Sequence, residues 1–239
     1  MNHKLLTICL LGGAAVASQG ASIGLNLGEG RPNTALAAND VAGVVPQSNW
    51  NNLSGTSNAG PVVLNSDSGT PSGASVAWAV EEAWSVGDTT GSPDGSLLNG
   101  FFSENAGDDS SITISNVPYA IYDLYVYLSH DRNLEDVILR EGGGQFPDFT
   151  AIENNTDVTV APVTYSPQTV SGSGSGNYVR FTNLTNSTVD LQLLTVDLGP
   201  GSIDRNAIAG IQLVQVPEPS VSLMGVITGL LLLGRRRRS

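Results

Sequence analysis

The feature that most constrains the fold is a series of short apolar runs in which hydrophobic residues alternate with polar ones. The clearest run is "YAIYDLYVYLS", residues 119–129. Alternation with a period of two is typical of β-strands, whose successive side chains point to opposite faces. One face would carry Tyr122, Leu124, Val126 and Leu128, and the other Ile121, Asp123, Tyr125 and Tyr127. Because both faces are rich in aromatic residues, we predict a central strand that is buried on both sides.

Further runs of this kind follow one another between residues 22 and 215, separated by turn-forming segments such as "GDTTGSPDG", "NAGDDS" and "GPGSID". In "GNYVRFTNL", Val179 and Phe181 lie opposite Tyr178 and Arg180. Roughly eight to ten short strands without intervening helices predict an all-β fold, an antiparallel β-sandwich of jelly-roll-like form. The segment "DGSLLNGFFS" could include a helical turn. We interpret "SGSGSG" as a long hairpin loop rather than a domain linker, because too few strands remain beyond it for a second core.

The N-terminus has the three parts of a secretory signal peptide. A positive start with Lys4 precedes the apolar stretch "LLTICLLGGAAVA", and Ala15-Val16-Ala17 forms an A-x-A cleavage site. A later cut after Ala21 is the second candidate, and we assign residues 1–21 to this signal. We predict export through the Sec translocon; a buried N-terminal helix is the alternative. Cys9, the single cysteine, lies inside the signal. The mature chain would therefore have no disulfide and no thiol nucleophile.

The C-terminus, residues 216–239, has a different composition. Ser220 to Gly234 carry no charge, and a helix of that length would span about 22 Å at about 1.5 Å per residue. This is shorter than the roughly 30 Å hydrocarbon core of a bilayer. The helix is followed by a membrane stop of four arginines, Arg235, Arg236, Arg237 and Arg238, which should stay on the cytoplasmic side. Pro217 and Pro219 keep the preceding segment extended. The pattern predicts a short transmembrane helix behind an exposed processing site.

Pro217-Glu218-Pro219, the short apolar helix and the arginine cluster resemble, in this order, the PEP-CTERM sorting signal of Gram-negative bacteria. The resemblance covers about the last two dozen residues. It implies recognition by exosortase, a membrane-embedded enzyme, with an inner-membrane intermediate and delivery to the cell surface or extracellular matrix. It also implies an association with exopolysaccharide. An ordinary tail anchor is the alternative interpretation. The segments "GVVPQSNWNN" and "NAIAGIQLVQVPEPS" more weakly resemble passenger domains of this family, which would be β-sandwiches.

The charge of the middle region excludes one class of partner. Between residues 22 and 216 five arginines face 21 acidic residues, a net charge of −16. A surface of this charge repels phosphates, so we expect no nucleic-acid binding.

The residues available for catalysis are few. His130 is the one histidine of the mature chain, which has no lysine, and the sequence contains no G-x-S-x-G motif. Glu81 and Glu82 are adjacent and would point to opposite faces of a strand, so they do not form a glycosidase pair by themselves. We therefore predict that the protein is not an enzyme, although carboxylates distant in sequence could still converge.

Calcium is the metal that the composition favours, since it binds carboxylate and carbonyl oxygens of loops. The candidate ligands fall in three loops and are Asp88 and Asp94, Asp108 and Asp109, and Asp197 and Asp204. None of the loops has the EF-hand pattern, and acidic turn residues that cap or solubilise are the alternative. No other cofactor is indicated.

One tryptophan is a candidate for contact with a sugar. Trp50 lies in the Asn-rich segment "QSNWNNLSG", and sugar sites stack a ring on an aromatic side chain among polar groups. Core packing is the alternative, and for Trp78 it is favoured. Two classes of function remain: a non-enzymatic, surface-sorted β-sandwich passenger, or a glycan-binding module or polysaccharide hydrolase of the same fold that contacts exopolysaccharide.

Overall fold

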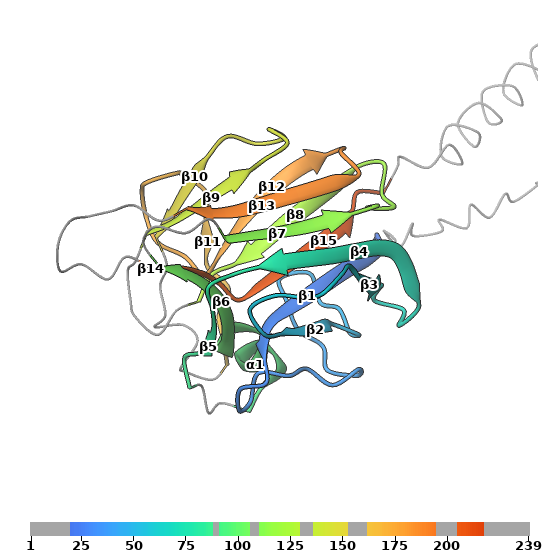
Figure 1. Ribbon diagram of the computed structural model, residues 1–239, viewed down its shortest axis with the longest axis horizontal. Helices are drawn as coiled ribbons and strands as arrows, with labels where there is room; N and C mark the ends of the chain where they lie inside the picture. Colours follow the sequence, from blue (N-terminus) through green and yellow to red (C-terminus); the bar gives the residue numbers. More distant parts are fainter. Residues whose placement is uncertain are drawn as a thin grey trace, which may run out of the picture. The chain divides into compact units, whose positions relative to one another are not determined.

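The alternating segments form β-strands in the computed structural model, which describes residues 20–87, 91–105, 110–129, 136–152, 162–194 and 205–217. Residues Ala21–Glu218 form one compact unit. Within the described residues, fifteen strands and one short helix make the fold all-β, as predicted. They form two six-stranded sheets and one three-stranded sheet (Figure 1).

The first six-stranded sheet has the order β11-β12-β8-β15-β1-β2. Its strands are β1 (Ser22–Glu29), β2 (Asn51–Ser54), β8 (Tyr122–Tyr127), β11 (Pro167–Gln168), β12 (Tyr178–Leu184) and β15 (Gly210–Gln215). The predicted central strand is β8, which lies between β12 and β15 and has all six residues buried. This confirms the expectation from its two apolar faces.

The second six-stranded sheet has the order β10-β9-β13-β7-β4-β3. Its strands are β3 (Val62–Asn65), β4 (Pro71–Ala79), β7 (Ser110–Ser115), β9 (Asp136–Glu141), β10 (Phe149–Ile152) and β13 (Thr188–Leu194). Along β7 and β13 every second residue is buried, which is the pattern of strands with one face on a core.

The third sheet has the order β14-β6-β5. Its strands are β5 (Glu82–Ser85), β6 (Gly100–Asn105) and β14 (Arg205–Ile208). Helix α1 (Pro93–Asn99) leads directly into β6. Ser92 caps the helix by accepting a hydrogen bond from the backbone N–H of Gly95, and proline stands at the first turn, where no N–H is required. The helical turn expected in "DGSLLNGFFS" is thus confirmed.

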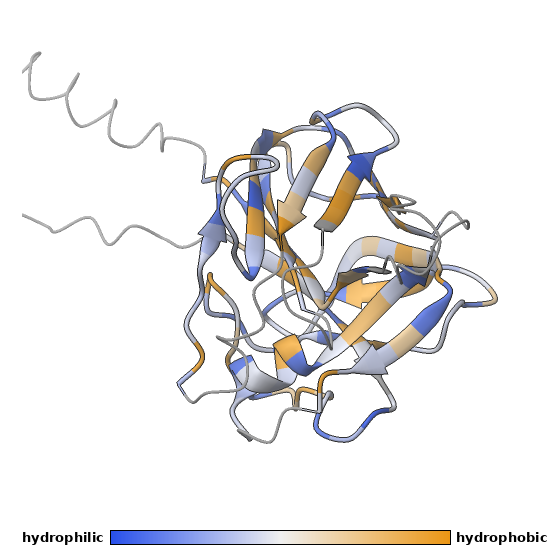
Figure 2. Cartoon of the chain, turned by 90° about the vertical axis from the view of Figure 1, so that its left-hand side faces the viewer, coloured by the Kyte–Doolittle hydropathy of each residue, from blue (hydrophilic) through white to orange (hydrophobic). Residues whose placement is uncertain are grey.

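One hydrophobic core receives side chains from both six-stranded sheets. Leu124 and Val126 of β8 share it with Ile112 and Ile114 of β7 and with Leu191 of β13. Each fully buried side chain of this size stabilises the fold by about 1.5–3 kcal/mol. Hydrophobic residues are interspersed with polar ones along the strands (Figure 2). The two sheets therefore face each other across this core.

A second hydrophobic cluster covers the other face of β8. Tyr125 and Tyr127 pack there against Trp50 and against Leu97 and Leu98 of α1. The Tyr127 hydroxyl donates a hydrogen bond to Gln212 Oε1 at 2.7 Å and accepts one from the Val44 backbone N–H at 2.9 Å. The segment 36–50 is thus held on the outer face of the first sheet.

The strand directions depart from the expected all-antiparallel arrangement. β1 runs parallel to β2, and β11 runs parallel to β12. The segment "SGSGSG", residues 171–176, lies between β11 and β12. Because these two strands are parallel, the connection must carry the chain back to the end of the sheet where β11 began. The expectation of a hairpin loop there was wrong, because hairpins join antiparallel neighbours.

Within the described part of the chain, no helix has the length and apolar character required to cross a membrane. Residues 1–19 of the predicted signal peptide and the predicted short helix over Ser220 to Gly234 lie outside the described residues.

Candidate functional site

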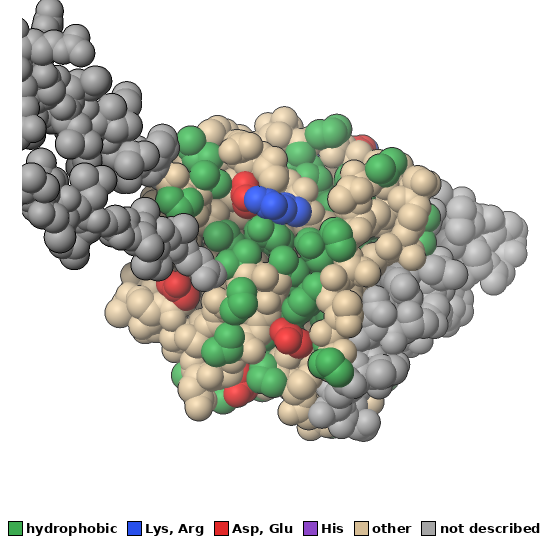
Figure 3. Space-filling view, turned by 180° about the vertical axis from the view of Figure 1, so that it is seen from behind, with side chains coloured by type: hydrophobic (Ala, Val, Ile, Leu, Met, Phe, Trp, Pro, Cys, Tyr) green, Lys and Arg blue, Asp and Glu red, His purple; other side chains and the backbone are tan. Residues whose placement is uncertain are grey.

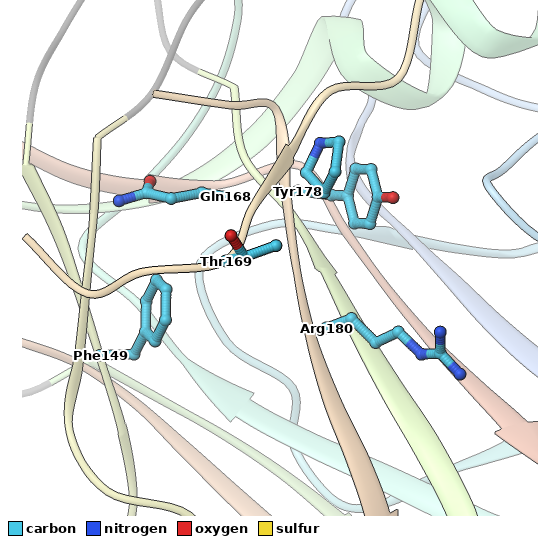
Figure 4. A pocket seen from close by; sticks show the side chains of 6 residues that line it. Phe149, Gln168, Thr169, Tyr178 and Arg180 are labelled. Carbon is cyan, nitrogen blue, oxygen red and sulfur yellow. The ribbon is translucent and has the colours of Figure 1, made fainter. Parts of the chain in front are cut away.

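A pocket of about 330 Å³ opens where the edge strands β10 and β11 of the two large sheets approach each other. The residues that line it come from β10, from β11 and the residue after it, and from β12 (Figure 4). They are Phe149, Pro167, Gln168, Thr169, Tyr178 and Arg180. Ligand pockets usually measure about 300–1,000 Å³, so this one is of a size for a small ligand or one unit of a polymer.

Strand β12 positions two of these side chains by simple alternation. Val179 and Phe181 point into the main core, and Tyr178 and Arg180 point outward on the same side of the strand (Figure 4). The rings of Tyr125, Tyr127 and Tyr165 approach the Tyr178 ring at centroid distances of 6.2, 6.4 and 6.3 Å. Contacts of this kind hold an aromatic ring in one orientation.

An ion pair fixes the guanidinium of Arg180. Its Nη2 lies 2.5 Å from Asp123 Oδ2, and the side chains are 50% and 10% exposed respectively. Asp123 also accepts a hydrogen bond from the Asn183 backbone N–H through Oδ1, at 3.0 Å. The hydrogen bond to Asp123 raises the pKa of Arg180 above its ordinary value. The guanidinium lies 5.4 Å from the centre of the Tyr125 ring, within the range of a cation–π contact.

Gln168 ties the two sheet edges together beside the pocket. Its Oε1 accepts a hydrogen bond from the Ile152 backbone N–H at 2.6 Å, and its Nε2 donates to the carbonyl oxygens of Val170 at 3.1 Å and Thr150 at 3.3 Å. Phe149 packs edge-on against Phe181, with the ring centres 5.9 Å apart. The pocket is therefore bounded by side chains that already have fixed positions.

The lining combines aromatic rings with hydrogen-bonding groups. Two aromatic rings, one guanidinium, one amide and two hydroxyl groups line it, and none of the six residues is a carboxylic acid, histidine or cysteine. Such a set can stack against a ring and donate hydrogen bonds, and it lacks the pair of carboxyl groups that glycoside hydrolysis usually employs.

On the face seen from behind the view of Figure 1, hydrophobic side chains gather near the centre, beside a basic side chain that lies next to an acidic one (Figure 3). Several hydrophobic residues that pack against the second hydrophobic cluster, on the outer face of the first sheet, remain partly exposed. They are Val44, Val45, Val163, Tyr165, Tyr178 and Val214.

The three tryptophans have different surroundings. Trp50 is 5% exposed, donates its Nε1–H to the Gln47 carbonyl at 3.1 Å and packs edge-on against Tyr127. This corrects the expectation of a sugar contact at Trp50, because its ring faces are covered by the protein. Trp78 is 8% exposed and belongs to the main core, as favoured. Trp84 is 45% exposed, and the Arg31 guanidinium lies 3.8 Å from the centre of its ring.

Of the six aspartates proposed as calcium ligands, the structure describes Asp94. It accepts hydrogen bonds through Oδ1 from the Tyr165 hydroxyl at 2.6 Å and the Gly43 backbone N–H at 2.9 Å. These bonds give the carboxylate a structural role. No three potential metal-binding side chains come together among the described residues. The other candidates lie outside those residues and are Asp88, Asp108, Asp109, Asp197 and Asp204.

Most of the remaining sequence-based candidates lie outside the described residues. Pro217 is the last residue described, in a non-helical conformation, and the rest of the sorting motif, Glu218 and Pro219, follows it. The arginine cluster, Arg235 to Arg238, and His130 are likewise outside.

Burial changes the titration of two tyrosines beside the pocket. The pKa values of Tyr127 and Tyr165 are raised above their ordinary value near 10, and burial is the largest cause for both. Nearby Asp94 contributes in the same direction to both pKa values, since a negative charge disfavours ionisation of a phenol. Both hydroxyls therefore remain protonated and act as hydrogen-bond donors over the physiological range.

Tyr178 and Arg180 were predicted to share one face of a strand but not to form a site. Their alternation with Val179 and Phe181 was the available signal. No family model matches this chain, and no curated protein and no solved structure was found to be similar to it.

Proposed function

We propose that this protein is exported and sorted to the cell surface or extracellular matrix, and that its β-sandwich is a non-enzymatic passenger domain that binds a ligand. The observation that carries the binding role is the composition of the pocket. Its rings, guanidinium and hydroxyls suit recognition, and its six lining residues include no acid, base or nucleophile pair. Hydrolysis by the same fold is the competing function, and it would require carboxylates from elsewhere.

The passenger domain is a sandwich of jelly-roll type in this proposal. Support comes from the strand order, which places β1-β15-β8-β12 next to one another in one sheet and β7-β13-β9-β10 in the other. Taken along the chain, these eight strands cross repeatedly from sheet to sheet, as in the two Greek keys of a jelly roll. The parallel strands β2 and β11 would be additions at the edges of this arrangement.

The sorting role rests on the C-terminal resemblance to PEP-CTERM proteins. The Sec translocon would export the chain, the short helix over residues 220–234 would pause it in the inner membrane, and exosortase would recognise Pro217-Glu218-Pro219. Moving an arginine to the centre of a membrane helix costs roughly 2.5–3.5 kcal/mol, so four of them would oppose transfer strongly. Calcium could still be bound by the loop aspartates, and exopolysaccharide is a candidate partner.

Mass spectrometry of the intact protein from the surface fraction tests the sorting role. We expect the mature form to lack residues 220–239. Replacing Arg235 to Arg238 with serine should let uncut protein pass through or misorient, whereas four lysines at these positions should preserve processing because they keep the charge. Glu218→Ala should accumulate uncut in the inner membrane. A mature surface protein that retains residues 220–239 would show that the segment is an ordinary anchor.

The non-enzymatic role is tested separately by incubating the protein with a panel of polysaccharides and measuring released reducing ends. We expect no turnover. Sustained release of sugar that a single Asp or Glu substitution abolishes would establish the hydrolase function instead.

A further inference from the structure

We propose that the pocket between β10, β11 and β12 binds one neutral pyranose unit of a polysaccharide, with Tyr178 as the stacking platform and Arg180 as the main hydrogen-bond donor. This inference rests on the proposed function of the domain as a binding module, and it names the site and the class of ligand.

The first argument is that the pocket combines a ring-stacking surface with hydrogen-bond donors. A pyranose presents an apolar C–H face and a rim of hydroxyl groups, so its site needs an aromatic side chain beside polar side chains. Tyr178 and Arg180 project to the same side of β12, and Phe149 lies across the pocket from them (Figure 4). The exposed Thr169 adds a hydroxyl to this rim.

The second argument is that the two main contacts are held in place without a ligand. Tyr178 is half-buried, and three tyrosine rings support it from the outer cluster. Arg180 is held by Asp123, which is itself held by the Asn183 backbone. Half of the Arg180 side chain remains exposed, so guanidinium N–H groups are accessible to a ligand. A site with fixed side chains loses less conformational entropy on binding.

The third argument concerns charge and favours a neutral sugar over a uronate or phosphate. The positive charge of Arg180 is compensated by Asp123 at 2.5 Å. The surrounding region, residues 22–216, has a net charge of −16, which repels anions. A neutral sugar avoids this repulsion and still accepts hydrogen bonds from the guanidinium. The carboxylate of Asp123 then acts by orienting Arg180.

The test is isothermal titration of the full-length protein, in mild detergent, with neutral hexasaccharides of β-linked glucose, mannose and galactose. An acidic oligosaccharide, a galacturonate oligomer, is titrated in parallel. The variants are Tyr178→Leu, which keeps an apolar side chain but removes the ring, and Arg180→Gln. Arg140→Gln is the matched control, because the Arg140 side chain is about as exposed as that of Arg180, forms an ion pair with Asp148 at 2.7 Å and does not line the pocket.

We expect at least one neutral hexasaccharide to bind, and Kd to rise roughly tenfold in each pocket variant, as the loss of a charged hydrogen bond or of an aromatic stack implies. Arg140→Gln should leave Kd unchanged. Near-ultraviolet circular dichroism verifies the packing of each variant. If Tyr178→Leu is not folded, Arg180→Gln decides the question, together with NMR. In the unsubstituted protein the sugar should shift the NMR signals of the pocket residues, and in Arg180→Gln these shifts should be lost.

Absence of binding to every neutral probe, preference for the galacturonate oligomer, or an unchanged Kd in both pocket variants would overturn the proposal. These outcomes differ from failure of the proposed function. A protein that is processed and exported but binds none of these sugars would retain its sorting role, whereas sugar release would replace the binding role itself.

Discussion

The Tyr165 hydroxyl donates a hydrogen bond to Asp94 Oδ1 at 2.6 Å, joining two residues that lie 71 positions apart in the chain. Asp94 lies in the first turn of α1, and the same oxygen accepts a hydrogen bond from the Gly43 backbone N–H. One carboxylate thus fastens the helix, the segment 36–50 and the segment before β11 on the outer face of the first sheet.

Removal of this carboxylate should loosen the three segments. Asp94→Ala leaves the Gly43 N–H and the Tyr165 hydroxyl without their partner, so we expect a loss of about 1–3 kcal/mol in the free energy of unfolding. Urea unfolding in calcium and in chelator measures it. The loss should be equal in the two buffers. The control Asp148→Ala removes one partner of the exposed ion pair with Arg140 and should have little effect. A loss confined to calcium-containing buffer would indicate that Asp94 is a metal ligand.

Buried tyrosines predict a loss of stability at high pH. The folded pKa values of Tyr127 and Tyr165 are raised, so above about pH 10 the unfolded chain releases protons that the folded chain retains. The contribution of these two tyrosines to the free energy of unfolding is therefore fully present below about pH 10. Above about pH 10 it falls by up to about 1.4 kcal/mol per pH unit for each tyrosine. Circular dichroism should follow unfolding together with the rise of tyrosinate absorbance. Ionisation of all tyrosines before unfolding would contradict this expectation.

The tryptophans should differ in stability cost and in fluorescence quenching according to their burial. Trp50→Ala removes a buried ring that packs against Tyr127, so we expect a loss of about 3–5 kcal/mol, whereas Trp84→Ala should cost far less. Thermal unfolding compares the two variants. Iodide should quench mainly the fluorescence of Trp84, and Trp84→Phe should remove most of that quenching. Equal quenching of Trp50 would show that the segment 36–50 opens.

Gly28 should resist substitution for a steric reason. Its φ is +83°, and a Cβ there would lie 2.6 Å from the Phe101 backbone nitrogen. Gly73 has a similar φ of +90°, but no atom lies within 4 Å of the position that a Cβ would take. Gly73→Ala therefore measures the cost of the backbone conformation alone. We expect Gly73→Ala to cost about 1–2 kcal/mol and Gly28→Ala to cost about 1–3 kcal/mol more, measured by urea unfolding. Equal losses would show that β1 and β6 separate easily.

Much of the main core could be predicted from the sequence, because alternation is a local property. The two apolar faces of residues 122–127 indicated a central strand, and β8 has one face in each hydrophobic cluster. The alternation of Val179 and Phe181 with Tyr178 and Arg180 likewise indicated β12. Local patterns do not specify partners, however. The parallel pairing of β1 with β2 depends on contacts with residues far along the chain, so it was not foreseen.

The candidate site was harder to predict for the same reason. Phe149, Gln168 and Tyr178 come from three strands, and their convergence depends on how two sheet edges meet. Trp50 appeared exposed because its neighbours are polar, yet those asparagines bond backbone groups: Asn51 Nδ2 donates to the Gly24 and Asn65 carbonyls, and Asn52 Nδ2 to the Leu36 carbonyl. These polar side chains bond to the backbone of neighbouring segments, so they do not indicate a solvent-exposed surface.

The pairing of β15 with both β1 and β8 determines how the domain would respond to mechanical load. Ser22 lies opposite Val214, so the chain enters and leaves the domain on neighbouring strands. The last strand is a central one, bonded on both sides, and the Val216 N–H adds a bond to the Ile121 carbonyl. A pull on Pro217 would have to break two hydrogen-bonded ladders together. A domain held by its C-terminal end would therefore withstand drag from flow better than one that ends in an edge strand.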